Sequence, residues 1–260
     1  MSLDFRKTVI AIASGLSLTA LSVPAIAKPS AEILSAVADE GRPEDERKLD
    51  ESRKPAQLLD FLGLKPGDQV LDIFASDGYF TEIIAAAVGP DGASIGWNLP
   101  SFNAREPSMV VWRELMRRHG NALLLLQTAD KIDVGTDRYD MVLMHLVYHD
   151  LYWESERFGI PRMEPSEILA KLYAATKPGG VVGVIDHVAV AGGDPRADAD
   201  ATHRIDPAVI LADFKAAGFV LEAESDMYRT PADDHVKTVF DPAVRGKTDR
   251  VVYRFRKPSA

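Results

Sequence analysis

The sequence of 260 residues contains no cysteine. This absence excludes disulfide bonds, thiolate metal ligands and cysteine nucleophiles. Any chemistry must therefore come from histidine, carboxylate, hydroxyl, lysine or arginine side chains, or from a bound cofactor. Hydrophobic residues make up 46% of the chain, so we expect a packed core large enough for one sizeable domain.

The chain also lacks an excess of positive charge. It has 30 Lys and Arg residues against 39 Asp and Glu residues, and its formal net charge is -9 at pH 7. The acidic residues are scattered, and there is no basic face of the kind that neutralises phosphates. We therefore expect no nucleic-acid partner.

The first 27 residues have the three parts of a secretory signal peptide. A short basic region precedes an apolar run over 8–23, and the small-x-small pattern Ala25-Ile26-Ala27 follows. The apolar run is shorter than the roughly 20 residues of a membrane span, which makes an uncleaved anchor the weaker alternative. We predict cleavage after Ala27 and a periplasmic or secreted protein without stable membrane insertion.

Glycine is scarce where a nucleotide-binding turn would need it. The stretch VLDIFASDGYFT, from Val70 to Thr81, predicts a buried strand, a tight turn and a helix. Such a turn normally carries three glycines, because glycine tolerates unusual backbone angles and the close approach of a ligand. Here only Gly78 occupies one of the three places, and Phe74 and Ser76 occupy the others. An ordinary strand-to-helix turn is the alternative interpretation.

Predicted strands and helices alternate from residue 52 onward. The inner strands are continuous apolar runs, which indicates a parallel sheet covered on both faces. A long polar loop over 229–248 joins the last two strands without a helix, so we expect the last strand to be antiparallel. The predicted fold is a three-layer, Rossmann-like α/β domain with a seven-stranded, mostly parallel sheet. The predicted strands cover residues 69–74, 93–98, 122–127, 139–145, 181–187, 219–225 and 250–255.

The chain divides into three predicted segments. Residues 1–27 are the signal peptide, 28–51 an N-terminal lead-in with a short helix over 31–38, and 52–260 the α/β domain. No internal repeat or linker divides the domain further.

Two polar residues follow the second and third predicted strands. Ligands of open α/β sheets bind beyond the carboxyl ends of the strands, so these positions are candidates for cofactor contacts. Asn98 stands where an acidic residue usually accepts hydrogen bonds from ribose, and its amide oxygen can also accept them. Asp130 could accept a hydrogen bond from an adenine amino group. A role in turn formation is the alternative at both positions.

The densest group of reactive side chains follows the fourth predicted strand, in HLVYHD from His145 to Asp150. An imidazole oriented by a carboxylate is the usual general base near neutral pH, so His149 and Asp150 are candidates for acid–base catalysis. His145 and His149 also have the spacing of a helical zinc pair. Because His145 ends an apolar strand, a packed core position is the better interpretation of that residue.

Two further histidines follow the fifth predicted strand. His187 comes directly after Asp186, and His203 precedes Arg204. Both could converge on His149, as an acid–base set or as a metal site with nitrogen and oxygen ligands, and the sequence leaves both possibilities open. The loop over 229–248 is either a functional lid or a surface excursion.

Several blocks of sequence resemble class I S-adenosylmethionine-dependent methyltransferases. These are LD at 71–72 running into Gly78, KPGG at 177–180 and AAGF at 216–219. More narrowly, the chain resembles a family of exported bacterial proteins described as predicted methyltransferases. The shared blocks are RKP at 53–55, FASDGY at 74–79, YHD at 148–150, DH at 186–187, HRID at 203–206, DDH at 233–235 and RGKTDR at 245–250.

The resemblance implies S-adenosylmethionine as the cofactor and a small molecule as the methyl acceptor. The positions that it places around the cofactor are Asp72, Phe74, Ser76, Gly78, Asn98 and Asp130. The residues on the acceptor side are His149, Asp150, His187 and His203. Arg53 and Arg204 could hold an anionic acceptor through paired hydrogen bonds.

A second hypothesis keeps the scaffold and drops the methyl transfer. The chain would then be a ligand-binding protein, or a metal-assisted enzyme built on His149, His187 and His203. Fold alone does not decide between these functions.

Overall fold

The computed structural model describes residues 28–104 and 106–259, so the predicted signal peptide lies outside the described residues. The centre of the molecule is a seven-stranded sheet in the order β3-β2-β1-β4-β5-β7-β6. Strands β1 to β5 are parallel, whereas β7 is antiparallel to both β5 and β6. The predicted Rossmann-like sheet with an antiparallel last strand is therefore confirmed. The strands are β1 (Gln69–Ile73), β2 (Ala93–Asn98), β3 (Ala122–Leu126), β4 (Tyr139–His145), β5 (Thr176–His187), β6 (Val220–Glu224) and β7 (Arg250–Arg256).

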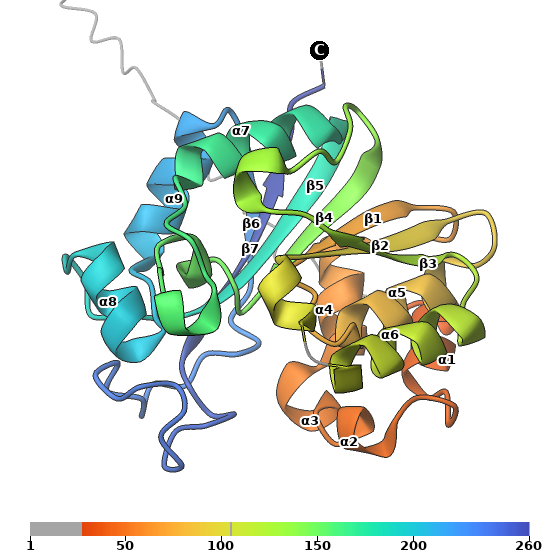
Figure 1. Cartoon of the computed structure of the whole chain (residues 1–260), viewed down its shortest axis with the longest axis horizontal. Helices are drawn as coiled ribbons and strands as arrows, with labels where there is room; N and C mark the ends of the chain where they lie inside the picture. Colours follow the sequence, from red (N-terminus) through yellow and green to blue (C-terminus); the bar gives the residue numbers. More distant parts are fainter. Residues whose placement is uncertain (1–27, 105, 260) are drawn as a thin grey trace, which may run out of the picture.

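Helices lie on both sides of this sheet (Figure 1). On one side are α4 (Pro55–Leu62), α5 (Tyr79–Val88) and α6 (Glu106–Arg118), and on the other are α7 (Pro165–Ala175) and α9 (Pro207–Ala216). Helix α8 (Pro195–Thr202) follows the end of β5. Short 3-10 turns complete the connections: η1 (Pro100–Asn103), η2 (Ala129–Lys131), η3 (His149–Leu151) and η4 (Glu156–Phe158). Within the described ranges, no helix is long and apolar enough to cross a bilayer.

The N-terminal lead-in packs onto the domain through three short helices, α1 (Ala31–Val37), α2 (Glu44–Arg47) and α3 (Asp50–Arg53). The predicted helix from residue 31 is thus present, and its Ile33 is buried in the same core cluster as α5 residues. Asp50 pairs with Arg42 at 2.9 Å and accepts a hydrogen bond from the Tyr79 hydroxyl at 2.5 Å. These contacts hold α3 against the start of α5, beside the carboxyl edge of the sheet.

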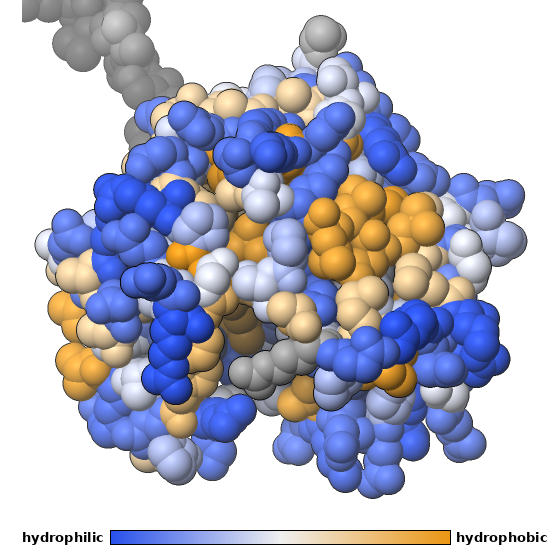
Figure 2. Space-filling view, in the orientation of Figure 1, coloured by the Kyte–Doolittle hydropathy of each residue, from blue (hydrophilic) through white to orange (hydrophobic). Residues whose placement is uncertain are grey.

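The leucine-rich strand β3 lies at the edge of the sheet and is only partly covered. Leu123 and Leu126 are 47% and 40% exposed. The connection from β3 to β4 contains the single turn η2 and a loop, without a longer helix. Figure 2 shows an apolar surface in this region. Leucines that the sequence pattern placed inside the sheet therefore lie partly at the surface.

Helix α6 packs onto the turn after β1 through the fully buried ring of Trp112. A Cβ atom at Gly96 of β2 would lie 2.4 Å from Trp112 Cη2 and 3.0 Å from the Cβ of Ala75. A Cβ at Gly78 would lie 2.6 Å from Leu115 Cδ1. Both glycines are therefore required for α6 to approach the sheet this closely.

Replacement of Gly96 by alanine is expected to destabilise the protein by about 1–3 kcal/mol, because the added methyl group overlaps a ring that cannot move freely. Gly120→Ala is the matched control, since an added Cβ there meets nothing within 4 Å. Its expected effect is within about 0.5 kcal/mol. Urea unfolding followed by tryptophan fluorescence measures the stability of both variants. Equal midpoints for the two variants would contradict the packing of Trp112 against Gly96.

Candidate functional site

The turn after β1 keeps a left-handed backbone at all three positions where glycine is usual. The φ angles of Phe74, Ser76 and Gly78 are 50°, 54° and 91°. Such angles cost roughly 1–2 kcal/mol for a residue other than glycine. The ring of Phe74 compensates by packing between Trp97 and Phe102, at centroid distances of 5.0 and 5.4 Å. The unusual residues therefore change the side chains of the turn without changing its backbone path.

Asn98, at the end of β2, holds this turn in place. Its amide oxygen accepts from the Ser76 backbone N–H at 3.0 Å, and its amide nitrogen donates to the Ser76 carbonyl at 2.8 Å and to Asn103 Oδ1 at 2.7 Å. Trp112 Nε1 donates to the same Ser76 carbonyl at 2.8 Å. The groups of Asn98 are thus used within the chain. Its predicted contact with ribose stays a prediction, and it would use the second lone pair of the amide oxygen.

The two carboxylates predicted for the cofactor side have opposite surroundings. Asp72 is buried at the end of β1 and accepts a hydrogen bond from Thr81 Oγ1 at 2.7 Å. Burial raises the pKa of Asp72 to about 7, against the opposing effect of that bond and of Arg53. Asp130 lies exposed on η2, where a hydrogen bond from the Thr128 side chain lowers its pKa. Only Asp72 belongs to the buried edge of the sheet.

All four acceptor-side candidates line one cavity beyond the ends of β4 and β5. Its volume is about 570 Å³. The predicted convergence of segments that are distant in the sequence is therefore present. The lining residues used below are His149, Asp150, His187, His203, Arg53 and Arg250.

His149 is oriented by a carboxylate that the sequence argument did not assign to it. Its Nδ1 lies 2.8 Å from Asp186 Oδ1, and its backbone N–H donates to Asp186 Oδ2 at 2.8 Å. Asp150, the expected partner, is on the other side of the ring, 3.4 Å from Nε2. Burial alone would lower the pKa of His149, but Asp186 and Asp150 outweigh it and raise the pKa to about 9. The two carboxylates therefore favour the protonated form of the ring, which donates hydrogen bonds.

Two further histidines, His187 and His145, are held apart from His149. His187 Nδ1 lies 2.6 Å from Thr248 Oγ1, and its ring centroid is 6.1 Å from that of His149. Burial lowers the pKa of His187 well below its usual value, so the ring is neutral at pH 7. His145 packs on the ring of Phe80 at 4.5 Å, as expected for a core residue. A zinc pair of His145 and His149 is therefore not supported.

Two arginines give the cavity a positive wall. Arg53 lies over the ring of Tyr79, with Cζ 4.3 Å from the centroid. Arg250 donates to Thr248 Oγ1 and to the Ser52 carbonyl, each at 3.1 Å. The direct contacts described for both guanidiniums are thus with neutral groups, and burial lowers the pKa of both. Sequence reasoning found Arg53 and missed Arg250, which begins β7 about 200 positions later in the chain.

Arg204, the other arginine predicted for an acceptor, has a structural role. It is fully buried and forms a paired salt bridge with Asp233, at 2.8 and 3.0 Å. It also donates to the carbonyl groups of Val188 and Lys237, at 2.9 and 2.8 Å. The pair fixes the start of the 229–248 loop to the end of β5, and Arg204 is not available to a ligand.

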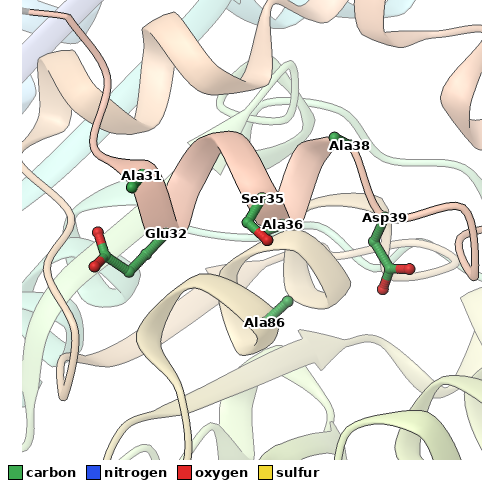
Figure 3. A pocket seen from close by; sticks show the side chains of 7 residues that line it. All are labelled: Ala31, Glu32, Ser35, Ala36, Ala38, Asp39 and Ala86. Atoms are coloured by element: carbon green, nitrogen blue, oxygen red, sulfur yellow. The ribbon is translucent and has the colours of Figure 1, made fainter.

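A second hollow, between α1 and α5, carries no comparable chemistry (Figure 3). Most of its lining is alanine. The carboxylates of Glu32 and Asp39 lie at opposite ends of α1 and do not approach one another in Figure 3. The cavity beyond β4 and β5 is therefore the better candidate for a site.

Comparisons with solved structures show which class of protein has this architecture. A S-adenosylmethionine-dependent methyltransferase from Aquifex aeolicus superposes with a TM-score of 0.55 and 18% identity, over 83% of this chain and 98% of that one. A 1,6-didemethyltoxoflavin-N1-methyltransferase from Burkholderia thailandensis was solved with bound 1,6-didemethyltoxoflavin and S-adenosylhomocysteine. It has a TM-score of 0.51 and 18% identity, over 83% of this chain and 80% of that one. The [4+2]-cyclase SpnF has a TM-score of 0.51 and 16% identity, over 88% and 93%.

The fold is therefore that of S-adenosylmethionine-dependent methyltransferases. The low identities establish shared architecture, which a cyclase also has. No family profile and no curated protein sequence matches the chain.

Breaking the buried salt bridge between Arg204 and Asp233, at the start of the 229–248 loop, is expected to destabilise the fold. Asp233→Asn removes the charge that compensates Arg204, at a cost of about 3–5 kcal/mol. Asp234→Asn is the control, because the Asp234–Lys237 pair is more than 40% exposed on both sides and is worth less than about 1 kcal/mol. Thermal unfolding compares the two variants, and a similar loss in both would contradict a structural role for Arg204.

Proposed function

We propose that this chain is a S-adenosylmethionine-dependent methyltransferase that acts on a small anionic acceptor. The observation that carries the proposal is the turn after β1, whose backbone is left-handed at Phe74, Ser76 and Gly78 although two of these are not glycine. Backbone strain that persists at the ligand-binding edge of a sheet points to function. The shared fold with methyltransferases supports the same reading.

The residues at this turn fit the amino-acid end of the cofactor. Ser76 and Asp77 are exposed at the tip of the turn, and α5 begins directly after Gly78. Backbone N–H groups at the start of a helix suit a carboxylate ligand. When bound, the cofactor supplies an activated methyl group on a sulfonium. The contribution of this chain is to hold donor and acceptor in a reactive arrangement, with Asn98 keeping the turn in shape.

The charge of the cavity favours an anionic acceptor. Arg53 and Arg250 line it, and the contacts described for their guanidiniums are with neutral groups. A partly buried guanidinium without a carboxylate partner is unfavourable, and an entering anion would form charge-assisted hydrogen bonds with it. We therefore propose an acceptor that bears a carboxylate or a similar oxyanion.

A non-methylating function on the same scaffold is the second candidate. It is favoured by the cluster of His149, Asp150 and His203, whose potential ligand atoms lie within 4.8 Å of one another. Such a protein would bind an anionic ligand, with or without a metal ion, and would have no need for S-adenosylmethionine. Binding of the cofactor therefore separates the two candidates.

Calorimetry with S-adenosylhomocysteine tests the cofactor site. The protein is expected to bind, and Ser76→Gly is expected to retain affinity within about threefold because glycine keeps the left-handed angle. Ser76→Val disfavours that angle by roughly 1–2 kcal/mol and should weaken binding about tenfold. Absence of heat at millimolar ligand, or equal affinity of the valine variant, would count against the proposal.

Export through residues 1–27 is part of the proposal. Its support is the order of basic region, apolar run and small-x-small pattern in the sequence. N-terminal sequencing of protein from the periplasm of expressing cells is expected to begin at Lys28. Recovery of the uncleaved chain from the cytoplasm alone would contradict export.

A further inference from the structure

Three side chains from two separate segments meet at the cavity. His149 and Asp150 belong to η3, after β4, and His203 caps the end of α8. Asp150 Oδ1 lies 3.4 Å from His149 Nε2 and 3.8 Å from His203 Nδ1. These separations are longer than the about 2.7–3.2 Å of an ordinary hydrogen bond. They are close to the roughly 3.3–3.5 Å expected between two ligand atoms of one tetrahedral zinc ion.

The imidazole of His149 is fixed by the buried carboxylate of Asp186. Asp186 is fully buried and accepts from the backbone N–H groups of His149 and His187, at 2.8 and 2.7 Å. It therefore acts as an acceptor toward His149 Nδ1 as well, at 2.8 Å. With a proton on Nδ1, the lone pair of Nε2 faces the carboxylate of Asp150. A cation between these two groups, a proton or a metal ion, removes their repulsion, and the separation of 3.4 Å is longer than a hydrogen bond through a proton.

The imidazole of His203 is oriented by its backbone conformation and by two aromatic rings. Its φ of 54° is left-handed, which is uncommon outside glycine and directs the side chain back toward η3. Trp153 and Phe240 pack edge-on against the imidazole, at centroid distances of 4.6 and 4.9 Å. These rings fix the orientation of the imidazole and leave Nδ1 toward Asp150.

We infer that His149 Nε2, Asp150 Oδ1 and His203 Nδ1 bind one divalent transition-metal ion. Two imidazoles and one carboxylate suit Zn²⁺, Co²⁺, Ni²⁺ or Fe²⁺, whereas Mg²⁺ and Ca²⁺ prefer oxygen ligands. Asp186 has the place of the outer carboxylate that orients a metal-binding histidine. Three protein ligands leave a coordination position open, as in catalytic rather than structural sites.

The three ligand residues line the same cavity as Arg53 and Arg250. An oxyanion in the cavity could therefore contact the metal ion and a guanidinium together. His187 stays outside this set, because the potential ligand atoms that lie within 4.8 Å of one another belong to His149, Asp150 and His203. The ligand set thus differs from the three-histidine rim expected from the sequence, with Asp150 in place of His187.

The inference does not depend on methyl transfer, since its test uses the metal ion alone. Untagged full-length protein, freed of metal by a chelator that is then removed, is titrated with Zn²⁺ by calorimetry and with Co²⁺ by visible absorption. One equivalent of metal is expected to bind, with a Co²⁺ spectrum typical of nitrogen and oxygen ligands. A parent protein that binds no stoichiometric metal overturns the inference and leaves the cofactor proposal standing.

Variants then assign the ligands. His203→Ala removes a ligand and should weaken Zn²⁺ binding at least tenfold, and Asp186→Asn should weaken it about 10–100-fold through His149. His235→Ala is the control: His235 bonds to Asp249 at 3.1 Å, away from the cluster, and its loss should leave affinity within about threefold. Circular dichroism verifies folding, and His203→Gln replaces the alanine variant if that variant unfolds. Zn²⁺ binding that is lost in His187→Ala but kept in His203→Ala would overturn the ligand set.

Discussion

The cavity beyond β4 and β5 depends on the buried carboxylate of Asp186. It accepts hydrogen bonds from the backbone N–H groups of His149 and His187 and lies against His149 Nδ1. A carboxylate buried without donors would be strongly unfavourable, so these contacts are what allow it to stand at the end of β5. In return it fixes the turn after β4 against β5 and sets which nitrogen of His149 faces the cavity.

The cofactor side depends on a different constraint, the left-handed turn after β1. Asn98 and Trp112 both bond to the Ser76 carbonyl, and Phe74 is packed between aromatic rings. Together these contacts offset the strain of two residues that are not glycine. The turn is consequently preorganised by side chains, whereas nucleotide-binding turns usually rely on the freedom of glycine.

The fold was predictable because its signals are local. Runs of strand length located all seven strands, although β5 begins at Thr176, five residues before its predicted start, and the helix-free loop over 229–248 indicated the antiparallel strand β7. The convergence of the histidines was also predictable, since the carboxyl ends of parallel strands share one edge. The partial exposure of β3 could not be predicted from its own residues, because the lack of a covering helix depends on the fold rather than on the strand itself.

The partners within the site could not be read from the sequence. Asp150 is adjacent to His149, yet the carboxylate that orients the ring is Asp186, which lies 37 positions away. Arg204 is adjacent to His203, yet His203 lies near Asp150 whereas Arg204 turns inward to Asp233. Neighbours in sequence thus face different environments, and pairing across β4, β5 and β7 decides which groups meet.

The turn after β1 and the cavity beyond β4 and β5 share one edge of the sheet, so charges at the two places interact. The cavity beyond β4 and β5 is lined by Arg53, Arg250 and His149, with the carboxylate of Asp150 among them. A sulfonium at the turn after β1 would add a positive charge to the same edge, and like charges in a partly buried site repel. An anion in the cavity would reduce this repulsion and form hydrogen bonds with the arginines. The electrostatics of the edge therefore favour joint occupancy by a cationic donor and an anionic acceptor over occupancy by the donor alone.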